Sequence, residues 1–223
     1  MSRYAASLLD TAPRSGRSLG HGYVQLDAGV VLAVEPPDAP RLPNGLAARL
    51  WRCSREELLG AEVWNARPVP RFGLAIRPRV ELDLERLVGL GPGMTPLGDD
   101  VLAGYLAGRS LYCGETQTLP DPCRTTALSA TLLRLAAAGE LPEPAHALLE
   151  GGDPEPLLAF GATSGKGLIV GLALGCPTGR LSAGDAALAF DVRLPFPESE
   201  TTYRLEARPL RLAQPGRHDI PLR

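Results

Sequence analysis

A change in residue pattern near position 83 is the feature that most constrains how this chain folds. Before it, residues 20–35 hold two valine-rich runs around Asp27-Ala28-Gly29, as in a hairpin, and residues 36–54 contain four prolines and an Asn-Gly pair, which exclude long helices. After it, leucine- and alanine-rich segments are bounded by glycine or proline. We therefore expect an α+β fold, with a β-rich, barrel-like or sandwich part over residues 1–82 and a mainly helical part over residues 83–223.

The expected helical segments share a high leucine and alanine content. They are residues 84–90, 99–113, 124–140, 142–151, 153–161, 165–175 and 183–190. Two glycine pairs at four-residue spacing, Gly104 with Gly108 and Gly171 with Gly175, each lie on one helix face, where they allow a neighbouring helix to approach closely. The alternating segment 201–212 predicts a C-terminal strand, and its proline indicates either an edge strand or a loop.

Composition and charge narrow the class of partner. The formal net charge is −2 and the sequence pI is about 6.0, so no basic field is available to hold nucleic acid. No apolar run reaches the length of a membrane helix, and the first residues lack the apolar core of a signal peptide, so we expect a cytoplasmic protein without membrane contact. The four cysteines are far apart and form no C-x-x-C pair, which gives no indication of a metal site.

The stretch GLGPGMTPLGDD, residues 89–100, predicts a fixed functional loop. Its glycines permit backbone conformations that other residues avoid, and its prolines stiffen the path. Such a loop presents backbone N–H groups, and a helix that begins near Asp99 adds the positive end of its dipole, so an anion or a carbonyl oxygen can bind there. Helix capping is the alternative role for one of the two aspartates, Asp99 and Asp100. The candidate binding residues in this loop are Gly91, Gly93, Thr95 and Gly98.

Two further helix starts carry polar residues that can face the same ligand. The candidates are Arg124, Thr125 and Thr126 before one helix, and Thr163, Ser164, Gly165 and Lys166 before another. Each set also fits an ordinary helix cap, but three such starts can direct their positive ends to one pocket. Lys166 is the only lysine among 23 basic residues, so we interpret it as a site that needs a compact ammonium; a surface lysine is the alternative.

Familiar catalytic motifs are not complete in this chain. The sequence before Lys166 does not form a nucleotide-binding P-loop, because Phe160 stands at the first glycine position and Gly167 at the hydroxyl position. The loop at residues 89–100 lacks the third glycine of a dinucleotide-binding motif. The three histidines are scattered and suggest no nucleophile–base pair. We therefore expect no cofactor and no covalent nucleophile.

The glycine loop, together with TTALSATLLRLAAAGE and GATSGKGLIVGLALG, resembles a bacterial family that includes the AllH-type subunit of oxamate carbamoyltransferase. The resemblance covers residues 85–175, with PNG and GAEVW as weaker support. The family pattern G-x-G-x-G-x-T-P-x-G-D-D falls here on Gly89, Gly91, Gly93, Thr95, Pro96, Gly98, Asp99 and Asp100. The chain departs from the family in two places. Leu97 stands where many members have serine, and residues 162–167 replace a His-Ser-Ser-Gly that is followed by an aspartate.

The resemblance implies a carbamoyltransferase subunit that handles carbamoyl phosphate and oxamate, or oxalurate in reverse, in purine (allantoin) nitrogen catabolism. It implies a small anionic substrate held by the loop, the helix starts, Arg124 and Lys166. Asp99 or Asp100 would orient or deprotonate the attacking amide, so that Asp99, Asp100 and Lys166 are the candidate catalytic residues. It also implies partner subunits. The alternative is a non-catalytic protein that binds a small anion in the same pocket for a regulatory purpose.

Overall fold

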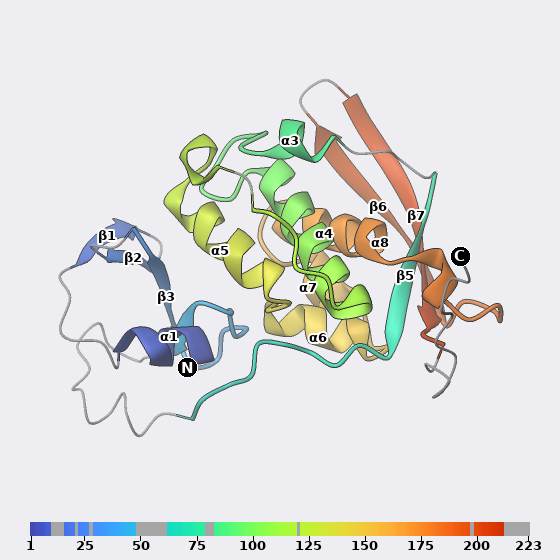
Figure 1. Ribbon diagram of the computed structural model, residues 1–223, viewed down its shortest axis with the longest axis horizontal. Helices are drawn as coiled ribbons and strands as arrows, with labels where there is room; N and C mark the ends of the chain where they lie inside the picture. Colours follow the sequence, from blue (N-terminus) through green and yellow to red (C-terminus); the bar gives the residue numbers. More distant parts are fainter. Residues whose placement is uncertain are drawn as a thin grey trace, which may run out of the picture.

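A computed structural model describes residues 1–9, 16–20, 22–26, 29–47, 62–78, 83–119, 121–196 and 199–211 of the chain. The mixed α+β class expected from the sequence is confirmed. A small sheet from the first part of the chain and a second sheet that includes the last strand flank a group of helices (Figure 1).

The N-terminal sheet has the order β1-β2-β3-β4. Its elements are α1 (Arg3–Leu9), β1 (Gly16–Gly20), β2 (Tyr23–Leu26), β3 (Val31–Glu35) and β4 (Gly45–Ala47). β2 and β3 are antiparallel, which confirms the predicted hairpin, and β4 runs parallel to β3. The expected barrel is not formed within the described residues, because β1 and β4 remain the two edges of an open sheet. The short helix α1 was not predicted.

The C-terminal sheet has the order β5-β7-β6, and its strands are antiparallel. They are β5 (Phe72–Arg77), β6 (Leu188–Phe196) and β7 (Ser199–Pro209). Two expectations are wrong here. Residues 183–190 were expected to be helical, but β6 begins within them and is fixed by its pairing with β7. β7 is the central strand, not an edge, and its proline is tolerated because Pro209 is the last residue of the strand.

The domain division at residue 83 stays a prediction. β5 precedes this position and pairs with β7 over its whole length. The first part of the chain therefore contributes a strand to the C-terminal sheet.

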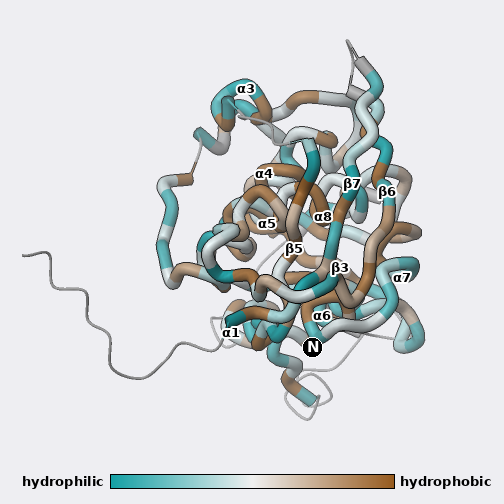
Figure 2. Tube along the Cα trace, turned by 90° about the vertical axis from the view of Figure 1, so that its right-hand side faces the viewer, coloured by the Kyte–Doolittle hydropathy of each residue, from teal (hydrophilic) through white to brown (hydrophobic). Residues whose placement is uncertain are grey.

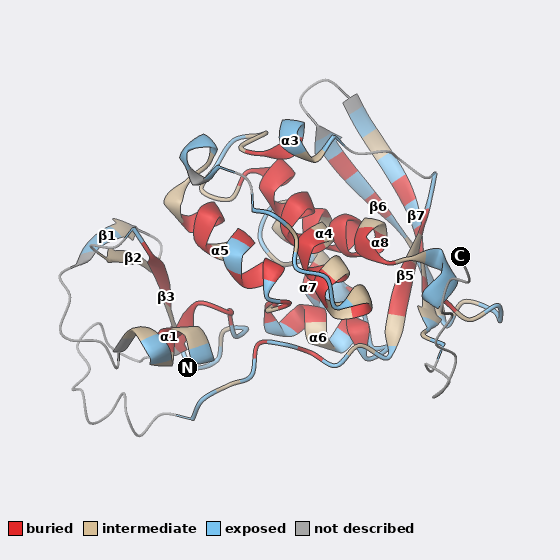
Figure 3. Cartoon of the chain, viewed as in Figure 1, coloured by how far each residue is buried: buried red, intermediate tan, exposed pale blue. Residues whose placement is uncertain are grey.

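The helices follow the expected segments closely. They are α3 (Leu84–Leu87), α4 (Leu97–Cys113), α5 (Ala127–Ala137), α6 (Glu143–Leu149), α7 (Glu155–Leu158) and α8 (Ser164–Gly175). Figure 2 shows hydrophobic residues along α4, α5 and α8, and Figure 3 shows that much of α4 and α8 is buried. Among the described helices, none is long and apolar enough to cross a membrane.

Close contact between α4 and α8 depends on glycine. A Cβ atom on Gly104 would lie 2.1 Å from the carbonyl oxygen of Leu168, and one on Gly171 would lie 2.0 Å from that of Val101. No side chain fits at these distances, so the two backbones touch directly. The close approach predicted from the glycine spacing is confirmed, and it brings the N-terminal turns of α4 and α8 together.

Candidate functional site

A cavity of about 580 Å³ lies between the N-terminal sheet and the helices. The glycine loop and the first turns of α4 and α8 form one side of it. The rest comes from β2, β3 and the segment after it, and from α5 and the segment after it. The polar residues that line it are Tyr23, Glu35, Thr95, Asp99, Asp100, Ser129, Glu140, Thr163 and Ser164. Most of the remaining lining is apolar, as is usual for a small-molecule site.

The Asp99 side chain holds the glycine loop in place. Asp99 is 2% exposed, and its carboxylate accepts hydrogen bonds from the Gly89 backbone N–H, at 2.8 Å, and from the Thr125 hydroxyl. Gly89 has φ of 71°, and a Cβ there would lie 2.4 Å from the Arg124 carbonyl oxygen, so only glycine fits. Both Asp99 oxygens are thus engaged, which gives this residue a positioning role.

The loop is also tied to the starts of α5 and α8. The Thr126 hydroxyl donates to the Met94 carbonyl oxygen and accepts from the Ser129 backbone N–H, which caps α5. The Thr95 and Ser164 hydroxyls lie 3.1 Å apart. The backbone N–H groups of residues 93–95 make no hydrogen bond with a described residue, and these residues line the cavity. The loop therefore keeps hydrogen-bond donors available at the cavity.

Asp100 is the buried carboxyl without a full set of partners. It is 8% exposed, and its Oδ2 atom has no hydrogen-bond partner among the described residues. Burial raises the pKa of Asp100 to about 8, a hydrogen bond with Ser164 opposes this rise, and the nearby charge of Asp99 adds to it. Asp100 therefore exchanges a proton near neutral pH.

Three other ionisable groups at the cavity were not predicted from the sequence. Burial raises the pKa of Glu35 to about 7, against a hydrogen bond from the Leu42 backbone. Burial raises the pKa of Tyr23, and Glu35 and Asp100 contribute to the rise. The pKa of Glu140 is also raised by burial, and its Oε2 atom has no hydrogen-bond partner among the described residues. The sequence contained one indication that Glu35 belongs to a site, namely a carboxylate at the end of an apolar strand. That indication was not sufficient, because the residues around Glu35 in the cavity come from a distant segment of the chain.

Six of the residues predicted from the sequence line the cavity, and seven do not. Those that line it are Gly93, Thr95, Asp99, Asp100, Thr163 and Ser164. Those outside the lining are Gly91, Gly98, Arg124, Thr125, Thr126, Gly165 and Lys166. Thr125 and Thr126 support the loop from behind, through Asp99 and Met94. Gly98 and Gly165 are close-packing positions, where a Cβ would lie 2.0 Å from the Leu87 carbonyl oxygen and 1.6 Å from that of Leu157 respectively.

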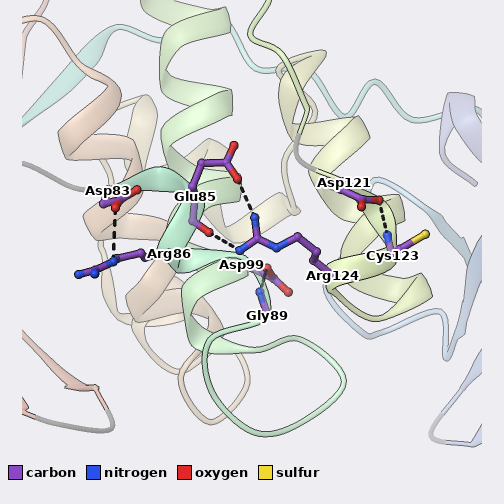
Figure 4. Close-up of polar contacts among 8 residues, drawn as sticks. All are labelled: Asp83, Glu85, Arg86, Gly89, Asp99, Asp121, Cys123 and Arg124. Atoms are coloured by element: carbon purple, nitrogen blue, oxygen red, sulfur yellow. Dashed lines mark hydrogen bonds and ion pairs between the residues drawn. The ribbon is translucent and has the colours of Figure 1, made fainter.

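The two expected cations lie away from the cavity lining. The Arg124 guanidinium bonds to the Glu85 carboxylate at 2.7 Å and to the Glu85 carbonyl oxygen at 2.8 Å, as Figure 4 shows. Lys166 is half-buried on α8 and makes no ion pair with a described residue. Their roles in binding an anion stay predictions.

The cavity lining formed by the residues that the structure describes is acidic. None of the described residues that line the cavity is lysine, arginine or histidine. In the described part of the chain, no cluster of three or more His, Cys, Asp or Glu residues has the geometry of a metal site. The site can thus transfer a proton through Asp100 and bind N–H donors through its carboxyl groups.

Comparison with known proteins gives one match. The family described as oxamate carbamoyltransferase subunit AllH matches residues 87–176. Searches of curated proteins and of solved structures returned no match. The matched segment contains the glycine loop, both aspartates and the starts of α5 and α8. Residues 87–176 of this chain are therefore similar to the AllH-type family.

Proposed function

We propose that this chain is a subunit of an oxamate carbamoyltransferase-like enzyme in purine (allantoin) nitrogen catabolism. Its cavity would handle oxamate with carbamoyl phosphate or, in the reverse direction, oxalurate with phosphate. One observation carries the proposal. The segment that matches the AllH family supplies the loop and the helix starts that line the cavity.

The chemistry needs a proton acceptor beside the oxamate nitrogen. This nitrogen forms a bond with the carbamoyl carbon, the bond from that carbon to the phosphate oxygen breaks, and the nitrogen loses a proton. We assign the proton transfer to Asp100, because a group with a pKa of about 8 can accept and return a proton near neutral pH. In the reverse reaction, protonated Asp100 donates to the departing nitrogen. Asp99 acts on the reaction only through the position of the loop.

The loop supports the binding of substrate oxygens. The N–H groups of residues 93–95 and the hydroxyls of Thr95 and Thr163 are donors of the kind that stabilise developing negative charge. The acidic lining does not neutralise a phosphate dianion. We therefore propose that partner subunits, which the word subunit in the family description suggests, bring the missing cationic side chains to the cavity mouth.

Phosphate-dependent cleavage of oxalurate tests the proposal. The chain is purified together with the products of its neighbouring genes, and carbamoyl phosphate formation is measured. Asp100→Asn is expected to reduce kcat by about 100-fold or more, the usual loss when an acid–base group is removed. Asp185→Asn, at an exposed site away from the cavity, serves as the matched control. Absence of turnover with every set of neighbours would contradict the proposal.

A second candidate is a non-catalytic protein that binds a small anion for regulation. It is favoured by the positions of Arg124 and Lys166 outside the cavity lining, which leave the chain without a complete catalytic set. Turnover that survives Asp100→Asn, in a protein that oxamate stabilises against heat, would support this second function.

A further inference from the structure

We propose that the acidic side of the cavity binds a primary amide or ureido group between the Glu35 and Asp100 carboxyls, and thereby selects ligands that carry an uncharged –CO–NH2 end. This inference rests on the proposed function and names the part of the substrate that the acidic side recognises. Glu35 is then a specificity-determining residue that lies outside the segment matched by the AllH family.

Two distant parts of the chain bring these carboxyls to the same cavity. Glu35 ends β3, and Asp100 lies in the first turn of α4. The Tyr23 hydroxyl lies near both, because each of them contributes to its raised pKa. The Oδ2 atom of Asp100 is buried and has no hydrogen-bond partner in the described part of the chain, which is costly unless a ligand completes its hydrogen bonds. Asp100 lines the cavity, so its incompletely hydrogen-bonded carboxyl lies at the wall against which a ligand would bind.

The hydrogen-bonding pattern of a protonated carboxyl matches that of a primary amide. Each group has a donor and an acceptor side by side, so the two can exchange a pair of hydrogen bonds. Burial raises the pKa values of Glu35 and Asp100 to about 7 and about 8, so both hold a proton for much of the time at neutral pH. A carboxylate or phosphate placed between them would instead meet like charge whenever either one ionises.

The glycine loop, which lies next to the first turn of α4 that carries Asp100, suits the rest of such a ligand. Residues 93–95 contribute backbone N–H groups that no described residue uses, and the Thr95 hydroxyl lies beside them. Oxamate joins an amide directly to a carboxylate. Its amide end fits the two carboxyls, and its carboxylate end fits the glycine loop.

The pH dependence of binding has a definite sign. The titratable groups that face the two carboxyls are Tyr23 from β2, Asp99 on α4 and Glu140 after α5. Glu35 and Asp100 lose their protons as the pH rises through about 7 and about 8. A primary amide then loses its donor partners and binds more weakly, whereas an organic cation would bind more tightly.

Calorimetric titration of the full chain with four probes tests the inference. Oxamate is compared with N,N-dimethyloxamate, which lacks both N–H donors, with oxalate, which has a carboxylate in place of the amide, and with ethylammonium, a cation. Wild type is expected to bind oxamate at least about 10-fold more tightly than the other three. Glu35→Gln, which keeps a donor and an acceptor, retains this preference with a weaker pH dependence. Glu35→Leu loses the preference, and Asp185→Asn is the control.

Several results would overturn the inference. They are equal binding of oxamate, dimethyloxamate and oxalate by wild type, an unchanged preference in a folded Glu35→Leu variant, no binding of any probe, and oxamate binding that becomes tighter as the pH rises. If Glu35→Leu does not fold, a Glu35→Gln variant whose pH dependence equals that of wild type also overturns it. If the protein cleaves oxalurate but does not prefer oxamate over the other probes, this inference alone is refuted. If it prefers oxamate but does not cleave oxalurate, the proposed function is refuted.

Discussion

Asp99 and Asp100 are neighbours in the chain, but their carboxyl groups have different surroundings. Asp99 accepts hydrogen bonds from Gly89 and Thr125 and so fixes the loop. Asp100 has one buried oxygen that makes no hydrogen bond with any residue the structure describes. The sequence predicted that both matter, but it could not separate their roles, because the partners of Asp99 lie 10 and 26 residues away along the chain.

The raised pKa of Asp100 makes protein stability depend on pH. The folded-state pKa of about 8 exceeds the unfolded value of 3.8, so between these values the folded state holds a proton that the unfolded state has lost. The free energy of unfolding of wild type therefore falls as the pH rises through this window, and the fall ends above about pH 8. Asp100→Asn cannot titrate, so its stability relative to wild type should increase by on the order of 4 kcal/mol from about pH 5 to 9.

Urea denaturation of both proteins across this range measures the difference. Glu35 titrates in both of them, so most of its contribution cancels. Asp185→Asn should follow wild type at every pH. A difference between Asp100→Asn and wild type that does not change with pH would show that Asp100 has an ordinary pKa.

Removal of the Asp99 carboxylate should destabilise the fold. Asp99→Ala leaves the partly buried Gly89 N–H and the Thr125 hydroxyl without their acceptor, at a cost of about 2 to 4 kcal/mol. Asp83→Ala, which removes an exposed carboxylate just before α3, should cost less than about 0.5 kcal/mol. Chemical denaturation gives both values. Equal losses in the two variants would contradict the positioning role of Asp99.

At the scale of elements, the contact between α4 and α8 should be intolerant of a single methyl group. Alanine at an exposed helix position stabilises by about 1 kcal/mol relative to glycine. Gly104→Ala should instead destabilise by about 3 kcal/mol, because its Cβ would meet the Leu168 carbonyl oxygen at 2.1 Å. Gly179→Ala is the control, since no atom lies within 4 Å of a Cβ at that position. Thermal unfolding shows the sign directly, and a stabilised Gly104→Ala variant would contradict the packing.

The sequence predicted elements well where local rules decide them. The glycine spacing in α4 and α8 and the turn at Gly29 were sufficient for the helix contact and the hairpin. Residues 183–190 have a helix-like composition, and only pairing with a later strand makes part of them β6. The place of Glu35 in the cavity could not be predicted either, because it depends on how the first sheet meets the helices.

At the scale of the whole molecule, a few polar contacts hold the N-terminal sheet against the helices. Thr131 on α5 is fully buried, and its hydroxyl accepts a hydrogen bond from the Val31 backbone N–H at the start of β3, at 3.3 Å. The Arg41 backbone N–H donates to Glu143 at 3.0 Å. These contacts set the distance between the two walls of the cavity.

Thr131→Val should therefore affect both stability and binding. The substitution keeps the shape of the side chain but removes the acceptor for the Val31 N–H, which should cost about 1 to 2 kcal/mol. Because β3 carries Glu35, oxamate should also bind more weakly. Thr202→Val, on the exposed face of β7, is the matched control. Denaturation and calorimetry test the two effects, and unchanged oxamate affinity in a destabilised variant would show that Thr131 does not help to position the binding wall.

The central position of β7 affects how the chain folds during synthesis. β5 ends at residue 77, and in the C-terminal sheet its partner is β7, which begins at residue 199. A ribosome that adds about 5 to 20 residues per second needs roughly 6 to 25 s to make the intervening segment. During that interval the backbone groups of β5 lack their final partner, while the helices between the two strands are already outside the ribosome. The nascent chain thus exposes an unpaired strand until β7 has been made, and this is the stage at which it is most open to chaperones and to aggregation.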